Sequence, residues 1–183
     1  MNIFYLHPDP AECAKLHNDK HVVKMILEYG QLMSTAHRVL DGKEYYGKTA
    51  NNRNIKRWLL PDERENMLWK ASHILHPSGI WTRASNENYK WLYRLWFYLL
   101  QEYTHRYGKH HSAERLMTHF YPYPINIPKG PFTQPTPAMP DQYKVTGDSI
   151  RSYINYYVGA KQHLASWKKR PIPNFMQETY AIL

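Results

Sequence analysis

Apolar residues recur every three or four positions along much of the chain, which is the spacing of one face of an α-helix. The longest such run begins at Asp19 and ends near Leu40. The apolar and polar alternation typical of a half-buried strand does not stand out. The pattern therefore predicts a mainly α fold in a single compact helical domain. The predicted helices lie at about residues 9–16, 19–40, 61–73, 85–107, 112–120 and 148–170.

Residues that favour helix ends support several of these boundaries. Asp9, Pro10 and Glu12 form the sequence of an N-cap, a proline at the first helical position and a capping box. Ser85 is the expected N-cap of the second long helix, and Gly108 is the residue expected to end it.

Three segments interrupt the helical pattern. Residues 43–57 are polar, with an asparagine and arginine cluster at 51–54, and predict a loop or a short basic element. Residues 76–79 predict a turn. Seven prolines between residues 122 and 140 exclude regular structure there, so about residues 121–147 are expected to be irregular. Residues 1–183, including this irregular segment, are expected to form one domain.

Composition and charge point to a polyanionic partner. Lys and Arg outnumber Asp and Glu by 24 to 15, which gives a formal net charge of +9. Aromatic residues make up 15% of the chain and often neighbour Arg, Lys or His, which suits phosphate neutralisation combined with base stacking. A single cysteine, no leader-like start and no apolar run of about 20 residues predict a cytoplasmic protein without a membrane span.

A polar stripe on the helix from Asp19 is the candidate catalytic face, because its members are three or four positions apart. Glu28 is the preferred carboxylate for stabilising or attacking a sugar cation, with Asp19 in reserve. His21 and Lys24 would act on the departing base or on a phosphate. The alternative is a solvated face with ordinary ion pairs. The stripe consists of His17, His21, Lys24, Glu28, Gln31 and Thr35.

A metal site is a weaker alternative for the same region. His17 and His21 are four positions apart and could bind zinc from one helical face, but a third ligand is not evident. We therefore expect no metal and no other cofactor.

A second set of residues is expected to contact DNA through cationic, amide or aromatic side chains. Each has a structural alternative, since Trp81 and the tyrosines could be core residues, Asn86 could cap a helix, and the cations near Gly108 could complement the helix dipole. The set consists of Lys20, Arg53, Trp81, Arg83, Asn86, Asn88, Tyr89, Arg106, Tyr107 and Lys109.

Short motifs across most of the chain resemble a family of phage and bacterial proteins. The layout is similar to pyrimidine-dimer DNA glycosylases of the endonuclease V type and to antiphage glycosylases that remove glucosylated hydroxymethylcytosine. The resemblance implies that Glu28 matches the catalytic glutamate of the dimer glycosylases. The motifs are residues 1–6 (MNIFYL), 19–25 (DKHVVKM) with Glu28, 76–77 (HP), 81–83 (WTR), 88–92 (NYKWL), 102–103 (EY), 106–109 (RYGK), 138–141 (AMPD) and 143–144 (YK).

The chain departs from the dimer glycosylases at its start. Their nucleophile is the amine exposed when the initiator methionine is removed before a small residue, whereas Asn2 is bulkier and should leave Met1 in place. A monofunctional enzyme that uses water is the simpler expectation, and Lys20 or Lys24 could supply an amine if one is needed.

These observations predict a DNA glycosylase that flips out and excises a modified or damaged pyrimidine. Its partner would be double-stranded DNA that carries such bases, with no obligatory protein partner. The alternatives are a non-catalytic nucleic-acid-binding protein and a metal-dependent nuclease built on the histidines.

Overall fold

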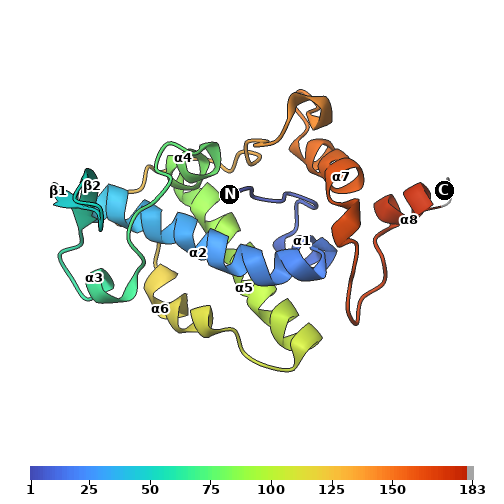
Figure 1. Ribbon diagram of the computed structural model, residues 1–183, viewed down its shortest axis with the longest axis horizontal. Helices are drawn as coiled ribbons and strands as arrows, with labels where there is room; N and C mark the ends of the chain where they lie inside the picture. The colour runs from blue at the N-terminus through green and yellow to red at the C-terminus, as the bar shows by residue number, and fades with distance from the viewer. Residues whose placement is uncertain (181–183) are drawn as a thin grey trace.

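The computed structural model describes residues 1–180 and confirms the mainly α fold (Figure 1). Three short 3-10 helices, η1 (Ser112–Leu116), η2 (Asp141–Tyr143) and η3 (Gln162–Leu164), supplement the α-helices. The helices and strands are α1 (Pro10–Leu16), α2 (Asp19–Asp41), β1 (Lys43–Lys48), β2 (Asn54–Leu59), α3 (Arg64–Met67), α4 (Pro77–Ala84), α5 (Asn86–Tyr107), α6 (Met117–Phe120), α7 (Ser149–Ala160) and α8 (Asn174–Tyr180).

The two long helices α2 and α5 pack against each other and form the centre of the molecule (Figure 1). The indole of Trp96 on α5 donates a hydrogen bond of 2.9 Å to the carbonyl of Ile26 on α2. Gly30 on α2 leaves room for the ring of Trp69, because a Cβ at this position would lie 2.7 Å from the nearest carbon of that ring. The core around this contact includes residues from Ile3 to Met176.

The first six residues form an extended, largely buried segment. The Phe4 amide donates to the Tyr29 hydroxyl of α2 at 3.0 Å, and the Ser78 hydroxyl of α4 donates to the Met1 carbonyl at 2.9 Å. The start of the chain is therefore attached to both α2 and α4, which places Met1 beside the polar stripe of α2.

Local capping predictions agree well with the helix starts and stops. Asp9 accepts from the amides of Ala11 and Glu12, and Ser85 accepts from the amide of Asn88. Gly108 has φ +70°, the left-handed conformation that favours glycine at a helix end. The reciprocal capping-box bond of Glu12 is absent, since the Glu12 carboxylate pairs with Lys15 at 2.7 Å.

Two helix predictions were too long and one turn prediction was wrong. The segment at 61–73 contains only α3, because the buried guanidinium of Arg38 binds the carbonyls of Glu65, Leu68 and Trp69 and holds the chain away from helical geometry. Helix α7 ends at Ala160 rather than near residue 170. Residues 77–84 form α4 where a turn was expected, since Pro77 is a favourable first helical residue.

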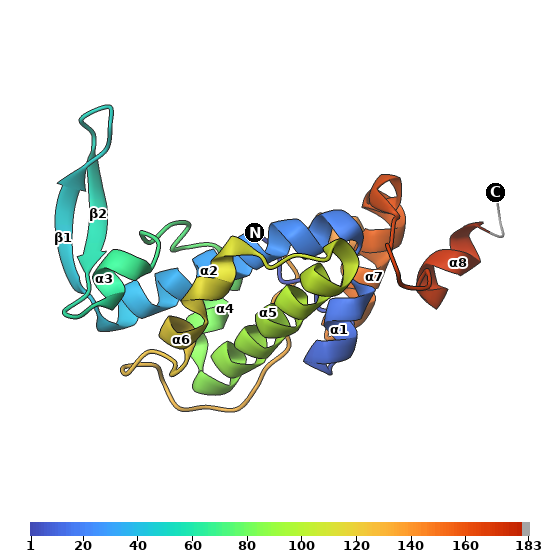
Figure 2. The ribbon, with the colours of Figure 1, turned by 90° about the horizontal axis from the view of Figure 1, so that it is seen from below.

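Residues 43–59 form an antiparallel hairpin rather than a loop. Strands β1 and β2 pair from Lys43 opposite Leu59 to Lys48 opposite Asn54, and the hairpin extends away from the helices in Figure 2. Both faces of the hairpin are largely exposed. Its sequence therefore lacks the apolar and polar alternation by which a half-buried strand is recognised.

Candidate active site around Glu28

Glu28 lies on the face of α2 that is turned toward the start of the chain and α4. Its carboxylate is 21% exposed and has a nitrogen near each oxygen. The Met1 amine is 4.0 Å from Oε2, and Lys24 Nζ is 3.3 Å from Oε1. A partly buried carboxylate in this position can stabilise a positive charge that develops beside it.

His76 joins this site from the N-terminus of α4. Burial lowers its pKa, the Met1 amine lowers it further, and the charge of Glu28 acts in the opposite direction. The Ser78 amide donates to His76 Nδ1 at 3.2 Å, so the neutral ring carries its proton on Nε2. His76 was absent from the predicted site residues, and the His76-Pro77 motif was the available signal.

Apolar side chains are exposed close to these polar groups. Leu75 directly precedes His76 and is 79% exposed, while Ile80 follows on α4 and Leu27 adjoins Glu28 on α2. Exposed aliphatic side chains of this size can serve as wedges between base steps when a protein distorts DNA.

His21 is buried and does not lie on the accessible face with Glu28. Its ring stacks on Phe4 with a centroid distance of 4.2 Å, and its Nδ1 lies 2.6 Å from the Tyr157 hydroxyl. The predicted contact of His21 with a base or phosphate is therefore corrected, because Phe4 and α7 cover the edge of the stripe on which His21 lies.

Asp19 is occupied by structural contacts. Its carboxylate accepts hydrogen bonds from Arg106 at 3.0 Å, from the Ser166 hydroxyl at 2.6 Å and from the Lys168 amide at 3.0 Å. These bonds tie the start of α2 to α5 and to the segment after η3. Asp19 is thus a structural link and not a reserve catalytic carboxylate.

Both ring nitrogens of His17 have protein partners. Nδ1 lies 2.8 Å from the Cys13 carbonyl and Nε2 lies 3.1 Å from the Tyr29 hydroxyl. Within residues 1–177, no three His, Cys, Asp or Glu side chains are grouped as metal ligands.

We expect the free energy of unfolding to decrease as the pH falls below about 6.5, because three histidines are buried in their neutral form. Burial is the main cause that lowers the pKa of His17 to about 4 and the pKa values of His21 and His37 to about 3. The unfolded chain takes up these protons near pH 6.5, so the stabilisation is complete above that pH and is lost toward the folded-state pKa values. Urea unfolding at about pH 7.5 and about pH 5 measures the change, and equal unfolding free energies would contradict it.

Several residues predicted to contact DNA are buried instead. Tyr89 donates to the Phe120 carbonyl, and the fully buried Arg106 binds Asp19 and Glu102. Trp81 and Asn88 are also buried. A surface role for these four residues is therefore corrected, since their polar atoms bind other parts of the chain.

The proline-rich segment explains the burial of Trp81 and Asn88. Within the predicted irregular segment at 121–147, only η2 is regular, and residues 130–133 bind α4 and the start of α5. The Trp81 indole donates to the Thr133 carbonyl at 3.1 Å, and the Thr133 amide donates to Asn88 Oδ1 at 2.8 Å. Asn86 accepts from the Gly130 amide in the same way. Asn86 and Asn88, which were predicted to contact DNA, thus bind the proline-rich segment at the start of α5.

Other members of the predicted DNA-contacting set lie at or near the surface. Lys20, Arg53 and Lys109 are exposed, so their contact with DNA stays a prediction. Tyr107 is partly exposed and donates to the Asp19 carbonyl at 3.2 Å. Arg83 is half-buried and donates to the Ile74 carbonyl, which directs its guanidinium toward the chain before α4.

Arg53 belongs to a strongly basic hairpin. Residues 43–59 contain five Lys or Arg and a single carboxylate, Glu44, for a net charge of +4 (5 − 1). Glu44 pairs with Lys56 at 3.0 Å, and Tyr46 beside them is 71% exposed. A projecting hairpin with cationic side chains and exposed aromatic rings is suited to bind the phosphate backbone of a nucleic acid.

Over residues 1–180, no helix has the length and apolar composition that a membrane span requires. Comparisons with protein-family models, with curated proteins and with solved structures give no match.

Proposed function

We propose that this protein is a DNA glycosylase that flips out and excises a modified or damaged pyrimidine base. The observation that carries the proposal is the environment of Glu28, a partly buried carboxylate near the Met1 amine and Lys24. Cleavage of an N-glycosidic bond places positive charge on the sugar and negative charge on the base. A site with a carboxylate and adjacent cations is complementary to both charges.

The hydrolytic route needs only groups that this site contains. A water oxygen bonds to C1′ of the flipped nucleotide, the bond from C1′ to the base nitrogen breaks, and its electron pair leaves with the base. Glu28 stabilises the sugar cation and accepts the water proton, while the base takes up a proton in turn. Lys24 and the Nε2 proton of His76 are the hydrogen-bond donors for the base or the adjacent phosphate.

A covalent route is the second candidate for the same reaction. The Met1 amine lies 4.0 Å from Glu28 Oε2, and a shorter contact is needed before the carboxylate can accept a proton from it. Attack of the neutral amine on C1′ would form a C–N bond while the bond to the base breaks, and the base would leave with the electron pair and take up a proton from the nitrogen. Opening of the C1′–O4′ bond, with transfer of the remaining nitrogen proton to O4′, would then give an imine. Borohydride reduction converts an imine into a stable protein–DNA adduct, so trapping with borohydride distinguishes this route from the hydrolytic one.

Base flipping requires the duplex to be opened at a cost of a few kcal/mol. Trp81 and Tyr89 cannot fill the vacated space, since both are buried. The exposed side chain of Leu75, next to His76, is the better candidate.

Reversal of two hairpin charges, Lys48→Glu with Arg53→Glu, should weaken binding to duplex DNA and leave base release per bound complex nearly unchanged. The plot of log affinity against log salt should become shallower by about 1 for each cation that no longer contacts a phosphate. Arg115→Glu with Lys129→Glu, at two exposed positions outside the hairpin, is the charge-matched control. Equal salt slopes for wild type and the hairpin variant would exclude the hairpin from the interface.

The three function classes give different products from modified, ultraviolet-treated and plain DNA. Base excision leaves breaks that appear only after heating in alkali and that persist in a chelator. A metal-dependent nuclease gives direct breaks that the chelator suppresses, and a pure binding protein gives none. Alkali-dependent, chelator-resistant breaks are the expected result, and either other pattern would overturn the proposal.

A further inference from the structure

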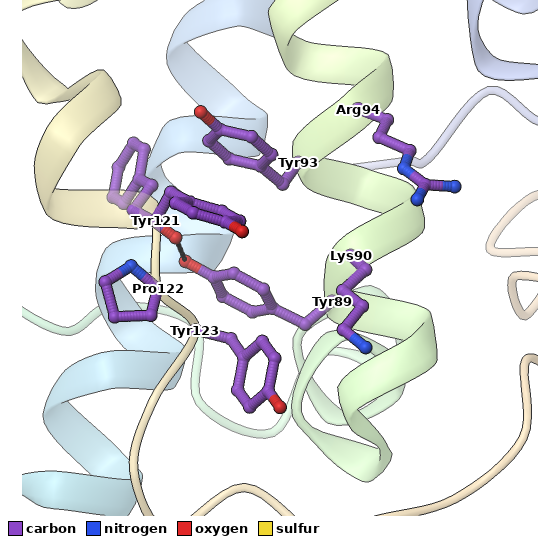
Figure 3. Close-up of a pocket in the computed structure, with 8 residues that line it drawn as sticks. Tyr89, Lys90, Tyr93, Arg94, Tyr121, Pro122 and Tyr123 are labelled. Atoms are coloured by element: carbon purple, nitrogen blue, oxygen red, sulfur yellow. Dashed lines mark hydrogen bonds between the residues drawn. The ribbon is translucent and has the colours of Figure 1, made fainter.

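A pocket lies between α5 and the segment that follows α6 (Figure 3). Its volume is about 560 Å³, which is sufficient for a small ligand. Four tyrosines and two cations determine its chemistry. They are Tyr89, Tyr93, Tyr121, Tyr123, Lys90 and Arg94.

This pocket is separate from the Glu28 site because it adjoins the opposite side of α2. His37 is nine positions after Glu28, or about two and a half helical turns, so the two side chains point in opposite directions. His37 Nε2 lies 2.8 Å from the hydroxyl of Tyr89, which donates to the Phe120 carbonyl. These bonds fix the Tyr89 ring as a rigid wall of the pocket.

Two further rings form an open aromatic surface. The centroids of Tyr93 and Tyr121 are 5.8 Å apart, with their planes inclined by 35°. Tyr121 is 68% exposed, and Figure 3 shows its ring beside that of Tyr93. Open tyrosine faces are suited to stack on a planar aromatic ligand.

The charge at the mouth of the pocket is positive. Arg94 is exposed, and among residues 1–177 no carboxylate forms an ion pair with it. Lys90 lies 5.2 Å from the centre of the Tyr123 ring and pairs with Glu87 at 2.7 Å. The pocket lining contains no carboxylate, so Arg94 is available to an anion without competition from the wall.

We propose that this pocket binds a nucleotide unit, with the base on the faces of Tyr93 and Tyr121 and the phosphate on Arg94. An apolar molecule would leave Arg94 without a partner, and a simple anion would leave the tyrosine faces without one. A free nucleotide and an unpaired nucleotide of a strand share this chemistry. The proposal does not require base excision, because Glu28 does not line this pocket.

Calorimetric titration of the protein with a deoxynucleoside monophosphate tests the pocket directly. Tyr121→Ala should weaken binding about fivefold or more, because stacking of one base on an aromatic ring contributes roughly 1 to 3 kcal/mol. Arg94→Gln should weaken the nucleotide more than the corresponding nucleoside. Tyr98→Ala is the matched control, since Tyr98 is a partly exposed tyrosine of α5 that does not line the pocket, and it should bind the mononucleotide like wild type.

Two further measurements complete the test. Glu28→Gln should bind the mononucleotide like wild type, which separates this pocket from the proposed reaction. Binding of a labelled oligothymidine distinguishes a nucleotide within a strand from a free nucleotide. If the strand binds tightly and the monomer weakly, and Tyr121→Ala reduces both affinities, the result supports an unpaired nucleotide of a strand. Equal binding of inorganic phosphate and nucleotide, or equal nucleotide affinity of wild type, Tyr121→Ala and Arg94→Gln, would overturn the proposal.

Discussion

Glu28→Gln should reduce base release by roughly a hundredfold or more while folding and DNA binding stay nearly intact. Glutamine keeps the size and hydrogen-bonding reach of the side chain but removes the negative charge that a cationic sugar needs. Stability should change little, because a partly exposed pair such as Glu28 with Lys24 contributes roughly 0 to 1 kcal/mol. Single-turnover assays at saturating enzyme, together with melting curves, separate the chemical step from binding and folding.

Glu63→Gln provides the matched control for that experiment. Glu63 is exposed at the start of α3 and makes no side-chain capping bond, so its substitution should leave base release unchanged. A Glu28→Gln protein as active and stable as wild type would remove Glu28 from the mechanism. Asp19 would not replace it, because its carboxylate is already bound to Arg106, Ser166 and Lys168.

Arg106→Met should destabilise the protein by roughly 3 to 5 kcal/mol, because it leaves a buried ion-pair network without its central cation. The guanidinium is fully buried and binds Glu102, Asp19 and the carbonyls of Lys15 and His17. Since these groups join α1, α2 and α5, their loss affects the core arrangement. The expected decrease in Tm is roughly 6 to 20 °C for a chain of this size.

Urea unfolding and DNA titration of the same variant distinguish a structural arginine from a DNA-contacting one. Folded Arg106→Met should bind DNA with nearly wild-type affinity, because the native guanidinium has no exposed surface. Arg115→Met, at an exposed position, should cost less than about 0.5 kcal/mol. A variant of unchanged stability that no longer binds DNA would show that Arg106 reaches the nucleic acid.

Much of the helical framework could be predicted from local sequence. The capping bonds of Asp9 and Ser85 and the left-handed Gly108 involve residues within four positions of each other, so their signals are contained in short windows. The extent of α3 could not be predicted in this way. It depends on Arg38, whose partners Glu65, Leu68 and Trp69 lie about thirty positions away.

The candidate site shows the same division between local and distant contacts. Helical spacing correctly placed Lys24 beside Glu28. It could not show that Phe4 and Tyr157 bury His21, nor that Met1 and His76 complete the site from other parts of the chain. Polar residues that looked available for DNA, such as Asn88 and Arg106, have partners 45 and 87 positions away.

Direct detection of the released base by mass spectrometry is the measurement that tests the proposed excision most directly. Wild-type protein with duplex DNA that contains glucosylated hydroxymethylcytosine, or pyrimidine dimers, should yield a free modified base or an alkali-labile abasic site without added metal. The Glu28→Gln protein should yield neither at the same time points. Absence of both products from wild-type reactions on every modified DNA, under conditions where the protein binds that DNA, would contradict the proposed function.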